Sequence, residues 1–183
     1  MIKMYDKLDS YSFKELLGYS IEAEKAANDY YSKFADAAIG ELMGERFKSL
    51  ARDEEIHKDA LLRIHKEEFG DEDYVVPEGD DLPAHETKFK FQGVMNMIDS
   101  IEKAVINENS ARRIYKYLAK REKKYASEFE YLAIMEKGHA ESLRSEKEML
   151  EGKVVDQPDR RGVSMKEFWA YHKDHHVSDI ERH

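Results

Sequence analysis

Cysteine is absent from this sequence, and proline (3) and glycine (9) are scarce among its 183 residues. Without cysteine the chain has no disulfide, no thiolate nucleophile, no cysteine-ligated zinc and no iron–sulfur centre. A metal site in this chain must therefore use His, Asp and Glu. The few Gly and Pro residues, together with 38% charged residues, favour long amphipathic helices over a β-rich fold.

Long apolar runs and an excess of basic residues are missing as well. No stretch of 18 apolar residues occurs, so we predict no membrane-spanning segment. Charged residues are spread through Met1 to Leu17, which excludes the apolar core of a signal peptide and leads us to expect a cytoplasmic protein. The net charge of −9 argues against nucleic acid as a partner, because phosphate binding needs clustered Lys and Arg.

The apolar pattern and the glycines divide the chain into four long helices. The expected helices are residues 13–38, the segment from the Gly40–Gly44 break to 69, 94–120 and 125–150. The segment from Gly70 to about residue 92 is acidic and contains two of the three prolines, which predicts an extended linker. We expect residues 1–151 to form the bundle domain and 152–183 a tail with a short helix at 164–173.

Two helical hairpins joined by one long linker predict an all-α fold, the ferritin-like antiparallel four-helix bundle. Short turns make the two helices of each hairpin antiparallel. A linker of about 20 residues, at up to about 3.3 Å each, can reach back along a whole helix. We therefore expect a one-crossover bundle, with the third helix starting at the same end as the first.

The two halves of the chain repeat one another. At an offset of 84, Glu24 and Tyr31 of the first helix fall on Glu108 and Tyr115 of the third. At an offset of 82, the second and fourth helices share the motif Leu-Ala-x-x-Glu-x-x-His. The motif residues are Glu54 and His57 in one half and Glu136 and His139 in the other.

These four glutamates and two histidines occupy positions of the buried apolar seam. Burying one unpaired carboxylate costs several kcal/mol, against a total stability of about 5–15 kcal/mol for a domain. Few Lys or Arg residues lie beside them on the seam, so metal cations are the simplest counter-charge. Four carboxylates and two neutral imidazoles balance two divalent cations.

Spacing supports the metal interpretation. Glu and His at i and i+3 lie about 60° apart on a helix, so both can reach one centre. A chain of this composition contains about one Glu-x-x-His motif by chance, but two in matching seam positions are much harder to obtain. The pattern is that of di-iron and di-manganese bundles, and the residue types do not distinguish iron from manganese or a mixed pair. The predicted ligands are Glu24, Glu54, His57, Glu108, Glu136 and His139.

The first helix, with Glu24 followed by Tyr31, Phe34 and Ala35, resembles the first helix of rubrerythrins. The two Glu-x-x-His motifs are similar to theirs as well, and the resemblance covers roughly residues 13–150. The set of six also resembles the ferroxidase centre of bacterioferritin. By this resemblance Glu54 and Glu136 bridge both metals. Glu24 and Glu108 are then terminal ligands, and His57 and His139 bind one metal each.

The chain departs from both families. A rubrerythrin proper carries a four-cysteine rubredoxin domain, and the lack of cysteine here implies an external electron donor. Rubrerythrins also have an additional glutamate beside the metal ligand of the third helix. In this chain Ala111 stands three residues after Glu108. Glu55 follows Glu54 where bacterioferritin has a haem-ligating Met, so we expect no haem.

The resemblance implies a di-iron oxidoreductase that binds two iron ions, oxidises Fe(II) and reduces hydrogen peroxide or oxygen. We expect a homodimer or a higher homo-oligomer. Three alternatives stay open. They are a ferritin-type iron-storage protein with a ferroxidase centre, a di-iron hydroxylase of a small organic substrate, and a metal-free helical interaction module.

Tyr31 and Tyr115 stand two turns from the terminal glutamates. They are candidates for hydrogen bonding to ligands or for carrying a radical, although a buried tyrosine more often belongs to the core. The remaining histidines are expected at the surface or in subunit contacts; they are His65, His85, His172, His175 and His176.

Overall fold

The computed structural model describes residues 8–38, 40–77, 82 and 94–155 of the chain. All regular secondary structure in this part is helical, and the predicted ferritin-like all-α bundle is confirmed. The elements are α2 (Phe13–Ala37), α3 (Glu41–Phe69), α4 (Val94–Arg121), the short 3₁₀ helix η1 (Lys123–Tyr125) and α5 (Ala126–Val155). None of the described helices is both long and apolar enough to cross a membrane.

Local sequence signals explain where the first hairpin begins and ends. Ser12 and Glu15 form a capping box, in which each side chain accepts a hydrogen bond from the backbone N–H of the other residue. Gly40, with a φ of 100°, lies in the turn between α2 and α3. Gly70 ends α3 in the left-handed conformation (φ 85°), and its N–H donates to the Lys66 carbonyl oxygen at 2.9 Å.

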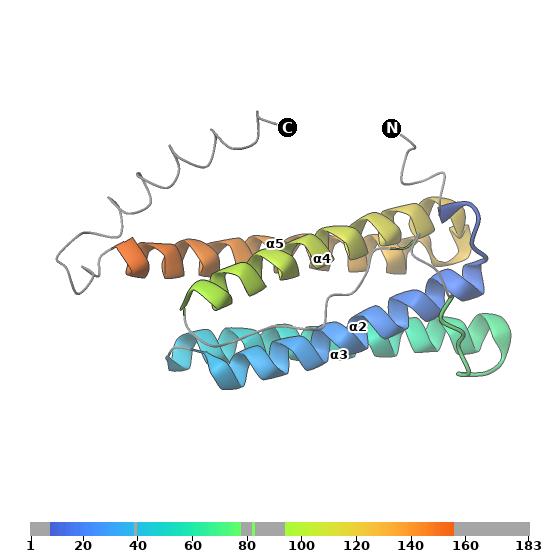
Figure 1. Cartoon of the computed structure of the whole chain (residues 1–183). Coiled ribbons are helices and arrows are strands. Elements are labelled where there is room, and N and C mark those ends of the chain that lie inside the picture. Colours follow the sequence, from blue (N-terminus) through green and yellow to red (C-terminus); the bar gives the residue numbers. More distant parts are fainter. Residues whose placement is uncertain (1–7, 39, 78–81, 83–93, 156–183) are drawn as a thin grey trace, which may run out of the picture.

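The bundle consists of two helical hairpins packed face to face (Figure 1). Helices α2 and α3 form one layer and α4 and α5 the other. Side-chain contacts join α2 to α4, where Tyr31 meets Glu108, and α3 to α5, where His57 meets Glu136. Each helix therefore has one neighbour within its own hairpin and one across the bundle.

The expected direction of the third helix is wrong. Tyr31 of α2 contacts Glu108 of α4, and Glu24 of α2 contacts Tyr115 of α4. The higher residue number in α2 is thus paired with the lower one in α4. Helix α4 is therefore antiparallel to α2 and starts at the end where α2 finishes (Figure 1). The reason is geometric: α3 already returns the chain to the start of α2, so a crossover along the bundle delivers it to the opposite end.

The apolar core is divided into two clusters by a polar layer. One cluster contains Leu17, Leu61, Ile114 and Phe129 near one end of the bundle. The other contains Phe34, Phe47, Ile101 and Leu143 near the other end. In every helix the predicted ligand positions fall between the two clusters, so the polar groups are buried at mid-height and kept from solvent at both ends.

The fourth helix is longer than expected. It continues to Val155 instead of ending at Leu150, and Gly152 lies inside it. A glycine weakens a helix by about 1 kcal/mol without necessarily ending it. The division of the chain at 151/152 stays a prediction, because the tail helix at 164–173 and the histidines at 85 and 172–176 lie outside the described residues.

Substitutions at two glycines test how tightly the segment around Val75, which follows α3, packs on the bundle. A Cβ at Gly18 of α2 would overlap the backbone carbonyl of Val75, whereas a Cβ at Gly138 of α5 would meet nothing within 4 Å. We expect Gly18→Ala to lower the free energy of unfolding by about 1–3 kcal/mol through this clash. Gly138→Ala should raise it by about 0.5–1 kcal/mol.

Urea unfolding of the metal-free protein, followed by circular dichroism, measures both changes. A Gly18→Ala variant as stable as the wild type would show that Val75 does not pack against α2 in solution.

Candidate metal centre

Helices α3 and α5 bring their Glu-x-x-His motifs together at the middle of the bundle. The His57 Nδ1 atom lies 3.1 Å from Glu54 Oε2 and 3.0 Å from Glu136 Oε1. The His139 Nδ1 atom lies 3.0 Å from Glu54 Oε1 and 3.5 Å from Glu136 Oε2. One ligating atom from each of these four buried residues lies within 4.8 Å of every other. The motifs thus form one group with donors from both hairpins.

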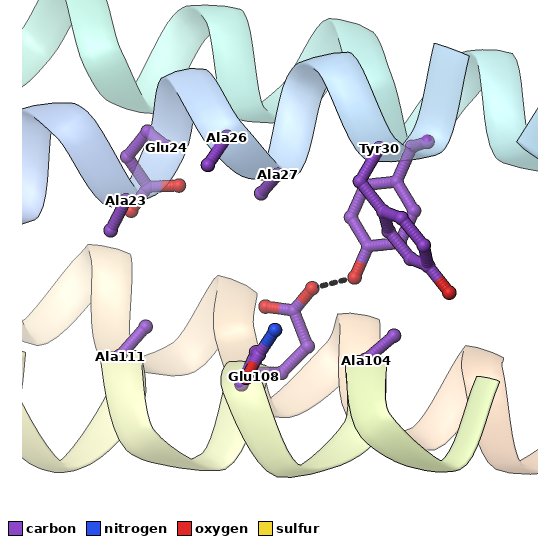
Figure 2. Close-up of a pocket in the computed structure, with 10 residues that line it drawn as sticks. Ala23, Glu24, Ala26, Ala27, Tyr30, Ala104, Glu108 and Ala111 are labelled. Atoms are coloured by element: carbon purple, nitrogen blue, oxygen red, sulfur yellow. Dashed lines mark hydrogen bonds between the residues drawn. The ribbon is translucent and has the colours of Figure 1, made fainter. Parts of the chain in front are cut away.

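Helices α2 and α4 add a glutamate each. The side chains of Glu24 and Glu108 enter the space between the two helices from opposite sides (Figure 2) and are only 2% and 4% exposed. Glu24 Oε2 lies 3.9 Å from His57 Nδ1. All six predicted ligands therefore converge on one buried layer, and their role as metal ligands stays a proposal.

Two tyrosines hold the terminal glutamates. The Tyr31 hydroxyl donates a hydrogen bond to Glu108, and the Tyr115 hydroxyl donates one to Glu24. Each tyrosine therefore binds the glutamate of the other half of the repeat, not the one on its own helix. The two bonds orient the carboxylates and tie α2 to α4 across the layer.

Several atoms of the layer lack a hydrogen bond of good geometry among the described residues. They are Glu54 Oε1, both carboxylate oxygens of Glu136, and both ring nitrogens of His139. Buried polar atoms are almost always satisfied, so such a cluster needs an explanation. Carboxylate oxygens and imidazole nitrogens are the donors that divalent iron and manganese accept. Two divalent cations would satisfy these atoms, and the residues present fit the predicted metals.

Burial and mutual contact shift the pKa values within the layer. Burial, followed by repulsion from Glu136 and Glu54, raises the pKa of Glu24 well above its usual value, and the same causes raise that of Glu108. Burial also acts to raise the pKa of Glu54 and Glu136. The contacts with the two histidines overcome it, and Glu108 adds to the effect at Glu136, so both pKa values are lowered.

The pKa values of the two histidines are raised. Burial opposes their protonation, but contacts with the two motif carboxylates prevail and raise the pKa of His57 to about 9 and that of His139 to about 10. Without metal, these shifts favour carboxylates at Glu54 and Glu136, imidazolium at His57 and His139, and protonated carboxyl groups at Glu24 and Glu108. That combination has zero net charge, and so would four carboxylates and two neutral imidazoles with two divalent cations.

A neighbouring buried glutamate shows the other way to balance such a charge. Glu146 of α5 is 1% exposed and forms an ion pair with Arg46 of α3. Among the ion pairs of the described residues, Glu24, Glu54 and Glu136 pair only with His57 or His139. Glu108 accepts a hydrogen bond from Tyr31. The charge of this layer is therefore balanced by groups that can lose protons, which is compatible with the predicted metal site.

Asp53 is an additional carboxylate beside the centre that the sequence analysis missed. Its Oδ2 atom lies 3.4 Å from Nε2 of His139, on the ring nitrogen that faces away from Glu54. A carboxylate in this position orients a ligating imidazole and raises its basicity. The only sequence signal was an Asp directly before Glu54. The matching residue in α5 is Met135, so the two halves differ here.

Comparison with known proteins identifies the family. The rubrerythrin family model matches residues 15–147, and a second match covers residues 99–168. The chain belongs to the rubrerythrin family. This confirms the predicted resemblance, and no rubredoxin domain is present in these 183 residues because they contain no cysteine.

A solved structure supports the same fold for this rubrerythrin-family chain. It is titled Hypothetical Protein Pfu-1136390-001 from Pyrococcus furiosus, and it is 30% identical in sequence with a TM-score of 0.74. The similarity covers 81% of this chain and 96% of that one. A comparison with curated proteins gave no match.

The pKa values predict that metal binding releases protons. His57 and His139 hold their protons below pH of about 9 and about 10, so a metal must displace them at pH 7. The two histidines alone give about two protons per pair of metal ions, and the raised pKa values of Glu24 and Glu108 add to that number. Metal affinity should therefore rise with pH across the neutral range.

Titration calorimetry with Co(II), in buffers of different ionisation enthalpy, counts the released protons. A release below about one proton per metal ion would contradict the protonation states described above.

The contact between Asp53 and His139 predicts unequal metal positions. Asp53→Asn removes the charge behind His139, and we expect the tighter-binding step, at the position held by His139, to lose about 10–100-fold in affinity. The exposed Asp59→Asn on the same helix is the matched control and should leave both steps unchanged. Two-step Co(II) titration of the metal-free protein measures this, and two unaltered constants in Asp53→Asn would refute the role of Asp53.

Proposed function

We propose that this protein is a non-haem di-iron oxidoreductase of the rubrerythrin type. It would oxidise Fe(II) and reduce hydrogen peroxide or oxygen, with electrons returned by an external donor. The observation that carries the proposal is the buried layer of four glutamates and two histidines, which is electrically neutral with two divalent cations and has no Lys or Arg counter-charge among its described ion pairs.

We assign the ligand roles by position and contact. Glu54 and Glu136 each lie close to both imidazoles, which supports a bridging role for each of them. Glu24 and Glu108 approach from the α2–α4 side as terminal ligands. His57 and His139 would each supply one nitrogen ligand. With two Fe(II) ions held there, the centre would provide the two electrons that, with two protons, convert one hydrogen peroxide molecule into two water molecules.

The protein's own residues supply what the metals do not. The apolar clusters above and below the layer limit access of bulk water and strengthen electrostatic interactions within it. Tyr31 and Tyr115 each donate a hydrogen bond from the hydroxyl group to one terminal glutamate. Their own pKa values are raised well above the usual range, mainly by burial. They therefore stay protonated and act as hydrogen-bond donors within the site.

Loss of the two bridging carboxylates tests the proposal directly. Anaerobic loading with Fe(II) should give about two iron ions per chain in the wild type, as the donor set fits two divalent cations. A Glu54→Ala, Glu136→Ala double variant should bind less than about a tenth as much at the same free iron concentration. Addition of stoichiometric peroxide should produce a near-ultraviolet ferric band in the wild type alone.

A matched double variant controls for lost negative charge. Glu55→Ala with Glu141→Ala removes one exposed carboxylate from each of the same helices and should leave both iron content and spectrum unchanged. No stoichiometric metal in the wild type would leave the fold standing and refute the proposed function.

A further inference from the structure

A small pocket opens between α2 and α4, directly over the terminal glutamates (Figure 2). Its volume is about 40 Å³. Its wall is unusually rich in alanine, with three from α2 and two from α4. The lining residues are Ala23, Glu24, Ala26, Ala27, Tyr30, Tyr31, Ala104, Asn107, Glu108 and Ala111.

The pocket connects the surface to the metal layer. Ala26, Ala27 and Ala111 are half-buried and form its outer part, whereas the carboxylates of Glu24 and Glu108 at its inner part are almost fully buried. Ala27 and Ala111 are equivalent residues of the repeat, one on each side of the opening. Larger side chains at these two positions would fill the space, so the alanines keep it open.

The opposite face of the bundle is closed by imidazoles. The rings of His57 and His139 stack with centroids 5.3 Å apart and planes tilted by 22°. Outside them, between α3 and α5, lies a wider groove of about 550 Å³ lined by residues such as Ala60 and Tyr131. His57 forms part of the groove wall, so a molecule in the groove meets an imidazole ring instead of the carboxylates.

We infer that the alanine pocket is the route by which the oxidant reaches the centre, and that its small size excludes bulky organic hydroperoxides. This inference rests on the proposed function. One water molecule needs about 10–15 Å³ of such space, so the pocket holds two or three water-sized groups and excludes a bulky organic hydroperoxide. Its lining is mainly apolar, and the carboxyl groups of Glu24 and Glu108 lie at its inner end.

Filling the pocket tests the inference. Ala111→Leu and Ala27→Leu place three additional carbon atoms in the opening, and Ala60→Leu is the matched control in the groove of the opposite face. Iron content and the rate of nitric oxide binding to the Fe(II)-loaded protein are measured together with the rate of oxidation by peroxides. Ala111→Val is the smaller alternative if a leucine variant does not fold.

We expect hydrogen peroxide to oxidise the wild type at least about tenfold faster than cumene hydroperoxide, because the aromatic ring does not fit. The two pocket variants should keep two irons per chain, yet slow both peroxide oxidation and nitric oxide binding by about tenfold or more. Ala60→Leu should change neither rate.

Two results would overturn the inference. Slow reactions in Ala60→Leu alone would make the groove the route. Equal rates with the two peroxides would refute selection by size. Failure of the proposed function is distinguishable, since it would appear as absent iron or absent oxidation in the wild type. Nitric oxide binding reports on the pocket even if no oxidant reacts.

Discussion

Electrical neutrality of one buried layer is the constraint on which the rest of the structure depends. Four carboxyl groups and two imidazoles lie at mid-height of the bundle, where unpaired charge is costly. Two arrangements would balance their charge: protons shared among the six groups, or two divalent cations. In both, the layer carries no net charge, so the helices can keep the same packing while protons and metals exchange. The two apolar clusters then stabilise the two ends of the bundle to the same extent whether the layer holds protons or metal ions.

The internal repeat gives the centre an approximate two-fold symmetry that is broken in a few places. Glu54 faces His139 as Glu136 faces His57, and the two tyrosine–glutamate bonds are related in the same way. Asp53 has no carboxylate counterpart, because Met135 occupies the matching position. Such a difference outside the ligand set lets two chemically similar metal positions differ in affinity while the surrounding helices stay nearly equivalent.

Much of this could be predicted from the sequence because the signals are local and repeated. The capping box at Ser12, the glycine at the end of α3 and the two Glu-x-x-His motifs each depend on residues a few positions apart. The six predicted ligands meet because seam positions on packed helices must converge. The family, once suspected from these residues, is confirmed by the comparison.

Features that depend on long-range packing were predicted poorly. The direction of α4 follows from the end at which α3 leaves the bundle, and the sequence pattern of α4 alone does not contain it. His65 was expected at the surface, but it is fully buried, with its Nδ1 atom 2.8 Å from the carbonyl oxygen of Asp71. Its bond is to the backbone of the following loop, whose path a helical pattern does not specify. The crosswise pairing of the tyrosines likewise appears only when the hairpins are packed together.

The antiparallel arrangement of equivalent helices has a consequence for how the site is assembled. Each hairpin contributes one terminal glutamate and one Glu-x-x-His motif, so each is half of a centre and neither is sufficient by itself. Bound metal would join the halves as a covalent cross-link joins two subunits, and the crossover serves mainly to keep them at high effective concentration. Seen this way, the chain is a tethered dimer of hairpins, and its proposed metal centre lies at the interface between them.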